Sequence, residues 1–294
     1  MLPISIGIKV LESLGVLKYL GKMLSPLMNL VGLPGDTGIV WASAMLSNIY
    51  GGMIAYAQMG NGIILSEAQI TVLTLMMLVA HTFPIELAVA HKSGVRWYVM
   101  FMIRFCFALM LGMILNLFNH TFQFGTSKSI QSWIHNEHDA TLTLSQWALE
   151  ELQRYGFIVV VIFVLLLLMK FLKRIGFLDK LSRSLEPILG ILGIHASVIP
   201  MTVIGLTTGL LYGGALIIKE TKEKEIPKLD IFYAMLLMGL CHALIEDTIL
   251  MVSLGANIFG VLIFRVIFSV LITFGIVRIT KLFDSDKMER FLTH

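Results

Sequence analysis

Long apolar runs dominate the chain, and polar residues gather in the shorter stretches between them. A membrane-spanning helix needs roughly 20 mainly apolar residues, and seven runs approach that length. They are Thr37–Ala57, Gln69–Ala90, Trp97–Phe118, Phe157–Leu172, Ser197–Ile218, Ile231–Val252 and Ile258–Ile279. No continuous alternation of apolar and polar residues is present, so the pattern predicts helices rather than the strands of a barrel.

Two further apolar stretches, Leu17–Leu33 and Leu178–Ile194, carry charged residues and one proline each. Because proline interrupts helical hydrogen bonding, we expect tilted, broken or re-entrant helices here. The run Ile4–Leu14 is too short to cross a bilayer alone and is either a half-helix or the end of a segment that starts further upstream. Together these patterns predict about 8–10 transmembrane or re-entrant helices.

The one long polar stretch is Asn119–Tyr155. Its middle, Gly125–Thr141, is rich in serine, asparagine, histidine and acidic residues and predicts a solvated linker. Its last part, from Leu144 to Leu152, has apolar residues at helical spacing and predicts an interfacial helix.

Composition supports a membrane protein. Of 294 residues, 57% are apolar and 14% charged, whereas soluble domains average about 45–50% and about 25%. This composition argues against a soluble enzyme, a nucleic-acid-binding protein or a disordered scaffold. The formal net charge of +3 is too small to indicate a polyanionic partner. We therefore expect the lipid bilayer as a partner, no nucleic acid and no enzymatic activity.

The two halves of the chain resemble each other at a nearly constant offset. Leu24-Ser25-Pro26-Leu27 matches Leu185-Glu186-Pro187-Ile188, Tyr50-Gly51-Gly52 matches Tyr212-Gly213-Gly214, and Leu78-Val79-Ala80-His81 matches Gly239-Leu240-Cys241-His242. The repeat predicts four parts: a first repeat over 1–118, an extracytoplasmic linker with an interfacial helix over 119–155, a second repeat over 156–282 and a cytoplasmic tail over 283–294.

Basic residues indicate that the two repeats are inverted. The loop Met59–Gln69 has no lysine or arginine, whereas its counterpart Lys219–Leu229 has four lysines. The loop His91–Arg96 has Lys92 and Arg96, whereas Ser253–Asn257 has no basic residue. Basic loops mark the cytoplasmic side, so matching loops lie on opposite sides. An odd number of crossings per half follows, five if each proline-containing segment counts as one.

We accordingly expect a multi-pass protein of the bacterial cytoplasmic (inner) membrane with a cytoplasmic C-terminus. Inverted repeats built on broken helices are typical of secondary transporters, whose site lies near the midplane where the halves meet.

Ionisable side chains inside the spans indicate a candidate site of this kind. His81 and Glu86 lie in one span, and His242, Glu246 and Asp247 lie at the matching place in the other. Buried ionisable groups in membranes generally mark a pathway or relay. His242 and Glu246, at positions i and i+4, would share one helix face.

His81 and Glu86, at positions i and i+5, converge only if Pro84 breaks their helix. The whole cluster would bind the substrate or a coupling proton. It would also suit a divalent cation such as iron(II) or manganese(II), with His81, Glu86, His242 and Glu246 as ligands. Alternatives are helix-to-helix hydrogen bonds, or pairing of Glu86 with Lys92 at the cytoplasmic rim.

The two Tyr-Gly-Gly motifs come late in apolar runs and indicate a second set of candidate solute-binding residues. Glycine pairs allow a helix to unwind or to approach a neighbour closely. If the helices unwind there, six polar side chains would face a solute: Ser47, Asn48, Tyr50, Thr207, Thr208 and Tyr212. The alternative is tight helix packing, with the tyrosines in the interfacial belt.

The doubled Leu-x-Pro…Gly, Tyr-Gly-Gly and His-x-x-x-(Ile/Glu)-(Glu/Asp) pattern resembles Gate-domain (nucleoside recognition domain) membrane proteins, in particular the YjiH-like branch. The resemblance runs from about Gly15 to Ile279. Gate domains are similar to elements of concentrative nucleoside transporters, ferrous iron permeases and spore maturation proteins. The resemblance thus implies an all-α polytopic membrane protein with two inverted Gate-like repeats, and a role in transport.

The function predicted is transport of a small polar solute, nucleoside-like or organic, by alternating access and coupled to a proton or cation. One alternative is a divalent metal ion permease, and another is a membrane scaffold or assembly factor without transport. No G-x-x-x-x-G-K-[ST] motif is present for nucleotide binding. We expect no cofactor beyond a bound divalent cation or coupling proton. A homodimer is compatible with the sequence, which shows no specific interface.

Overall fold

The computed structural model of the protein describes residues 6–7, 10–11, 14–58, 65–125, 143–223, 225–283 and 285–294. Every regular element in these ranges is helical, and an isolated bridge pairs Val95 with Thr293. Five helical segments of the described chain are long and apolar enough to cross a membrane: Glu67–Lys92, Trp97–Phe122, Ser145–Arg174, Lys228–Ser253 and Phe259–Leu282. The predicted all-α polytopic fold is confirmed. Most of the run Ile4–Leu14 lies outside the described residues.

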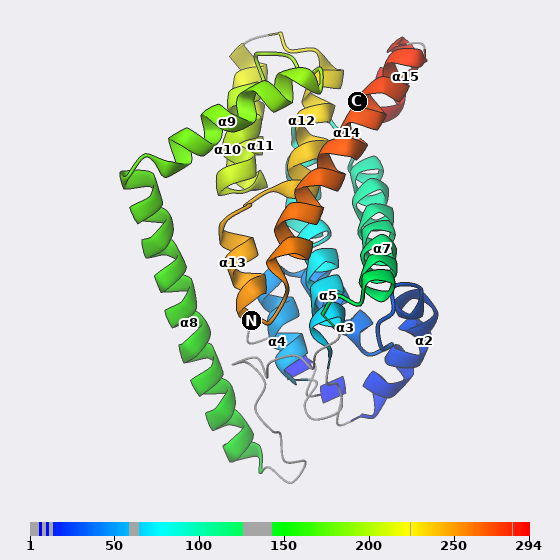
Figure 1. The fold of residues 1–294 in the computed structure, drawn as a ribbon, viewed down its shortest axis with the longest axis vertical. Helices are drawn as coiled ribbons and strands as arrows, with labels where there is room; N and C mark the ends of the chain where they lie inside the picture. Colours follow the sequence, from blue (N-terminus) through cyan, green and yellow to red (C-terminus); the bar gives the residue numbers. More distant parts are fainter. Residues whose placement is uncertain are drawn as a thin grey trace.

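The helices of the two halves follow each other in the same order. The first half contains α2 (Val16–Leu30), α3 (Thr37–Leu46), α4 (Ile49–Gln58), α5 (Glu67–Val79), α6 (Phe83–Lys92) and α7 (Trp97–Phe122). The second contains α9 (Phe177–Ile191), α10 (Ile199–Thr208), α11 (Leu210–Glu223), α12 (Lys228–Cys241), α13 (Glu246–Ser253) and α14 (Arg265–Leu282), with a π-helical turn at Phe259–Phe264 before α14. In Figure 1, α3 and α4 lie toward the lower end of the molecule, and α10 and α11 toward the upper end.

Left-handed backbone positions repeat with the same offset as the sequence. Four pairs of residues, each separated by as many positions as His81 and His242, share a positive φ: Gly15 and Gly176, Gly32 and Gly193, Thr82 and Ala243, and Gly94 and Gly255. Three of the pairs are glycines, which adopt this conformation readily, whereas the fourth, Thr82 and Ala243, consists of residues that rarely do. The repeat in the sequence is therefore also a repeat in the backbone. The four-part division of the chain stays a prediction.

The predicted spans Thr37–Ala57 and Ser197–Ile218 are wrong as single spans. Each forms a helical hairpin instead, α3–α4 and α10–α11, with turns at Ser47–Asn48 and at Gly209. Gly209 has φ 115° and ψ 152°, a conformation that ends α10 and that glycine adopts readily. The Asn48 Oδ1 accepts a hydrogen bond from the Gly51 amide and so starts α4.

Glycines let the arms of each hairpin pack closely. A Cβ placed on Gly52 would lie 2.8 Å from the Ala44 Cβ, and one on Gly213 would lie 2.7 Å from the Gly205 Cα. This is the tight packing that was the alternative reading of the Tyr-Gly-Gly motifs. The hairpins return to the side from which they start, which removes crossings that the sequence had suggested.

α8 (Leu144–Arg174) is one continuous helix of 31 residues. It begins with a capping box in which Thr143 and Gln146 each bond the other's backbone amide. The predicted interfacial helix Leu144–Leu152 is thus the first part of a longer helix, because no proline separates it from the apolar run that follows and the helix continues through Gly156. α8 lies along one edge of the molecule (Figure 1). Residues 126–142 of the predicted linker lie outside the described residues.

Three long spans, α5–α6, α7 and α8, lie between equivalent points of the two halves, rather than the five crossings expected. The number is still odd, so α5–α6 and α12–α13 run in opposite directions (Figure 1). α2 and α9 keep Pro26 and Pro187 inside continuous helices, so neither is broken.

The middle of the molecule is formed by α5–α6 and α12–α13. Within an apolar stretch of 18 residues in each span, 72% and 78% of the residues are buried in these two spans, against 11% in α8. Both central spans are interrupted halfway, between Val79 and Phe83 and between Cys241 and Glu246. Thr82 with φ 52° and Ala243 with φ 47° form the interruptions.

The predicted tail is packed against the rest of the protein. Ser285–Leu292 form α15, and the chain that follows pairs with the loop between α6 and α7. Arg96 Nε donates to the Thr293 carbonyl at 2.8 Å, and the His294 amide donates to the Gly94 carbonyl at 3.0 Å.

Candidate functional site

At each of the two helix interruptions, a buried arginine donates hydrogen bonds to the backbone carbonyls at the break. Arg104 of α7 donates from Nε to the Val79 carbonyl at 2.9 Å and from Nη2 to the His81 carbonyl at 3.3 Å. Helix ends leave carbonyl groups without partners and carry partial negative charge. A guanidinium therefore satisfies and stabilises the carboxyl end of α5 inside the membrane.

Arg265 performs the same task for α12. It donates from Nε to the Leu240 carbonyl at 3.1 Å and from Nη2 to the His242 carbonyl at 3.0 Å. Both arginines are 0% exposed. Arg104 and Arg265 are not among the residues predicted from the sequence. Both nevertheless lie in apolar spans and are separated along the chain by the same offset as the two histidines.

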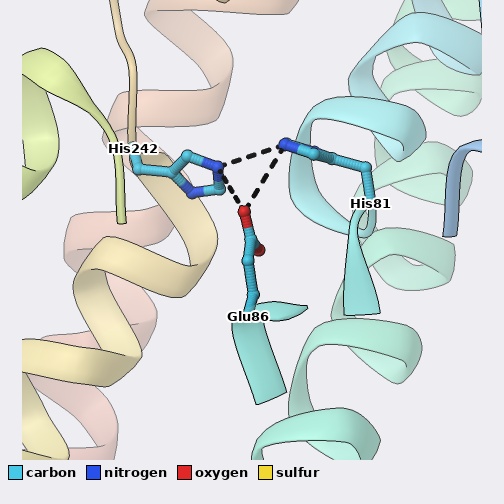
Figure 2. Close-up of side chains that lie close together, drawn as sticks. All are labelled: His81, Glu86 and His242. Atoms are coloured by element: carbon cyan, nitrogen blue, oxygen red, sulfur yellow. Dashed lines mark hydrogen bonds and ion pairs between the residues drawn. The ribbon is translucent and has the colours of Figure 1, made fainter. Parts of the chain in front are cut away.

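The interruptions bring together side chains from both halves (Figure 2). His81 and His242 face each other with their Nε2 atoms 3.1 Å apart. Glu86 Oε1 lies 3.2 Å from His242 Nε2 and 3.8 Å from His81 Nε2. These three side chains are only 4–6% exposed. We call His81, Glu86 and His242 the histidine–glutamate cluster.

Glu86 is also paired with Arg104, whose Nη1 lies 2.5 Å from Glu86 Oε2. The structure thus gives Glu86 a different partner from Lys92, which is exposed. His81 and Glu86 converge because the chain is interrupted at 80–82, just before Pro84 enters the first turn of α6. Glu86 itself lies in that first turn, where the helix dipole favours an anion.

Glu246 lies outside the cluster, contrary to its assignment as a metal ligand. His242 is beyond the end of α12 while Glu246 begins α13, so the two do not share a helix face. Glu246 instead hydrogen-bonds to the Tyr50 hydroxyl.

Asp247 is the counterpart of Glu86 in the second half, at the same offset that relates His81 to His242. It is buried, and its Oδ2 has no hydrogen-bond partner among the described residues. The same holds for Nη1 of Arg265, which corresponds to the Arg104 nitrogen that contacts Glu86. The first half therefore makes a carboxylate–guanidinium contact between Glu86 and Arg104. In the second half, the equivalent atoms of Asp247 and Arg265 have no hydrogen-bond partner among the described residues.

The other predicted solute-binding residues do not reach the cluster through their polar groups. The hydroxyls of Ser47, Thr207 and Thr208 each donate to the carbonyl one turn earlier in their own helix. Asn48 caps α4, and Tyr212 is 67% exposed. The backbone near the hairpin turns does touch the interruptions: the Thr82 amide donates to the Ala44 carbonyl, and the Leu244 amide to the Leu206 carbonyl.

The cluster has the composition of a metal site. Its two imidazole nitrogens and one carboxylate oxygen all lie within 4.8 Å of one another, from three buried residues. Imidazole and carboxylate together suit first-row divalent metals. The same groups can also share a proton, so the geometry supports either ion.

The chain is similar to one protein family and to one membrane protein of Bacillus subtilis. The family model for Gate domains, described as nucleoside recognition, matches residues 1–96. The chain is 29% identical over 287 residues to the uncharacterized membrane protein YvoD of Bacillus subtilis, covering 95% of this chain and 88% of the relative. No solved structure matches significantly. The first third of this membrane protein, including His81 and Glu86, therefore carries the Gate sequence pattern.

Proposed function

We propose that the protein is a transporter that moves a small polar solute or ion by alternating access, with the histidine–glutamate cluster binding the substrate or the coupling ion. The nucleoside-recognition description of the matching family favours a nucleoside-like or organic solute. The end of α11, the start of α12 and the C-terminus lie at one end of the molecule (Figure 1), and Arg96 donates to the Thr293 carbonyl there. Because lysines and arginines gather in these segments, we assign this end to the cytoplasmic side of a bacterial inner membrane.

One observation carries this proposal: two interrupted helices, one from each half, place ionisable groups at a buried junction. His81 and His242 are each near the middle of a 26-residue span. Interrupted helices that meet near the membrane midplane are how secondary transporters build their sites. A buried charge is costly there, so ionisable groups kept at such a place generally serve a function.

The unequal pairing of the two halves supports a mechanism. Glu86 contacts Arg104 and the two histidines. By contrast, Asp247 Oδ2 and Arg265 Nη1 have no hydrogen-bond partner among the described residues. In an inverted repeat, exchanging the conformations of the halves converts one access state into the other. We propose that Asp247 takes the place of Glu86 in the second state, so that the two carboxylates alternate at the histidine pair.

Transport is tested with purified protein in liposomes. Uptake of uridine, succinate and Zn²⁺ is followed with and without a pH gradient, for the wild type, Glu86→Gln and the control Glu186→Gln. Glu186 is an exposed carboxylate on α9, outside the cluster. We expect saturable uptake of at least one probe, unchanged by Glu186→Gln. Loss of a charged contact should lower uptake at least about tenfold in Glu86→Gln.

Absence of protein-dependent uptake for all three probes, or equal uptake in wild type and Glu86→Gln, would contradict the proposal. The first result would favour the scaffold alternative, which is also compatible with histidines that are buried. Uptake of Zn²⁺ alone would favour the metal permease, for which the ligand set of the cluster is the supporting observation.

A further inference from the structure

The hydrogen bonds of the two histidines determine where their ring hydrogens are. His81 Nδ1 lies 2.8 Å from the Met77 carbonyl oxygen, and His242 Nδ1 lies 2.8 Å from the Met238 carbonyl oxygen. A carbonyl oxygen can only accept, so both Nδ1 atoms carry the hydrogen and donate it. In neutral rings both Nε2 atoms therefore present lone pairs.

Those lone pairs point at each other and at a carboxylate. The two Nε2 atoms are 3.1 Å apart, and Glu86 Oε1 is within 3.8 Å of both. Arg104 contacts the other carboxylate oxygen, Oε2, rather than Oε1. Three electron-rich atoms that converge in a buried site repel one another unless a positive ion lies between them.

The size of the triangle suits a metal ion. Given sides of 3.1, 3.2 and 3.8 Å, a point in its plane lies about 2.0 Å from all three atoms, and zinc binds histidine nitrogen and carboxylate oxygen at about 2.0–2.2 Å. The surroundings agree, because metal-bound histidines usually donate their other N–H to a backbone carbonyl or carboxylate. Three protein ligands leave a further coordination position open.

We propose that His81 Nε2, Glu86 Oε1 and His242 Nε2 bind one first-row divalent transition-metal ion at the junction of the two halves. Its role as cargo or coupling ion rests on the proposed transport function, whereas its binding does not. Asp247, with its open Oδ2, is the nearest unsatisfied carboxylate in sequence to His242 and would be available to the ion in the exchanged state.

The test uses the full-length protein purified in detergent, stripped with a chelator and then equilibrated with Zn²⁺ or Co²⁺. Bound metal is counted by mass spectrometry after gel filtration, and affinity is measured by competition with a chelator. Variants are His81→Gln, His242→Gln and Glu86→Gln, and the matched control is Glu246→Gln, a neighbouring carboxyl outside the cluster. Circular dichroism and gel filtration verify that each variant is folded.

We expect one ion per chain in the wild type and in Glu246→Gln. Each ligand variant should lose at least about 100-fold in affinity, since even residues that only support a ligand typically cost about 10–100-fold. X-ray absorption at the zinc edge of the wild type should show two imidazoles and oxygen at about 2.0–2.2 Å. This measurement decides the matter even if a variant fails to fold.

Stripped wild type that binds neither ion, affinity that is equal in the ligand variants, or a zinc spectrum without imidazole would each overturn the proposal. The first result would leave a proton shared by the two imidazoles as the positive ion. The outcome is separable from transport: uptake without metal binding removes only this site, and metal binding without uptake of any probe removes only the transport proposal.

Discussion

At the scale of single residues, the arginines explain how a broken helix survives inside a membrane. The guanidinium groups of Arg104 and Arg265 donate hydrogen bonds to backbone carbonyls that have no helical partner at the interruptions. In hydrocarbon each unsatisfied backbone group is costly, so the interruptions and the arginines depend on each other. The charge of Arg104 is offset by Glu86, which couples this structural role to the histidine–glutamate cluster.

Replacing Arg104 with methionine should therefore be more damaging than the same change at Arg265. Arg104→Met leaves Glu86 buried without its cation, a loss that typically costs about 3–5 kcal/mol. Arg265 has no equivalent contact at Nη1 among the described residues, so Arg265→Met should cost less. The free energy of unfolding, measured with denaturant in detergent micelles, compares the two variants.

The double variant Arg104→Met with Glu86→Gln provides the control. Removing the carboxylate charge as well should recover part of the lost stability. If Arg104→Met and Arg265→Met destabilise equally, and the double variant recovers nothing, then the ion pair does not have the role given to it here.

The residues of the cluster were predictable from the sequence, but their pairing was not. His81, Glu86 and His242 stand out as ionisable groups in apolar spans. Their distances depend on where the helices break, and Pro84 only indicates the neighbourhood of one break. Glu246 appeared equivalent to a ligand because an unbroken helix would place it beside His242, whereas the break at Ala243 separates them.

At the scale of elements, the hairpins mark the limit of hydropathy. Thr37–Ala57 and Ser197–Ile218 are as long and apolar as true spans, so length and composition could not distinguish them. The informative signals are small: a Ser-Asn pair in one hairpin and Gly209 in the other. The short helices of each hairpin are stabilised by packing against each other rather than by their length. Hydropathy does not report this packing, so it could not show that the chain turns back.

Substitution at the glycine contact tests the hairpin directly. In Gly213→Ala the new Cβ would lie 2.7 Å from the Gly205 Cα and 2.8 Å from the Met201 carbonyl oxygen, both backbone atoms. Such overpacking typically costs about 1–3 kcal/mol, so the melting temperature in detergent should fall.

Gly275→Ala in α14 is the matched control, because a Cβ there meets nothing within 4 Å among the described residues. Replacing glycine inside a helix by alanine should then stabilise by about 0.5–1 kcal/mol. Equal melting temperatures for the two variants would show that the arms of α10–α11 are not in close contact.

At the scale of the whole molecule, the repeat relates the parts to each other. A single constant offset relates the two histidines, the two arginines, the carboxylates Glu86 and Asp247, and four pairs of left-handed backbone positions. The opposite directions of the two halves could be predicted from the basic loops. The number of crossings could not, because it depends on which apolar segments turn back and on α8 being one continuous helix.

In the proposed mechanism the molecule alternates between two states in which Glu86 and Asp247 exchange places at the histidine pair. In the proposed exchange the hairpin turns would move with the two halves. Asn48 and Thr208, next to these turns, are exposed. Replacing each by a spin-labelled cysteine, in a chain whose native Cys106 and Cys241 are replaced, allows their separation to be measured in lipid nanodiscs.

Electron–electron double resonance between these labels is the most direct test. We predict two distance populations in the wild type, with Asp247→Asn enriching the state described here and Glu86→Gln enriching the other, because each removes one of the competing carboxylates. A single distance distribution that is the same in the wild type and both variants would contradict the account.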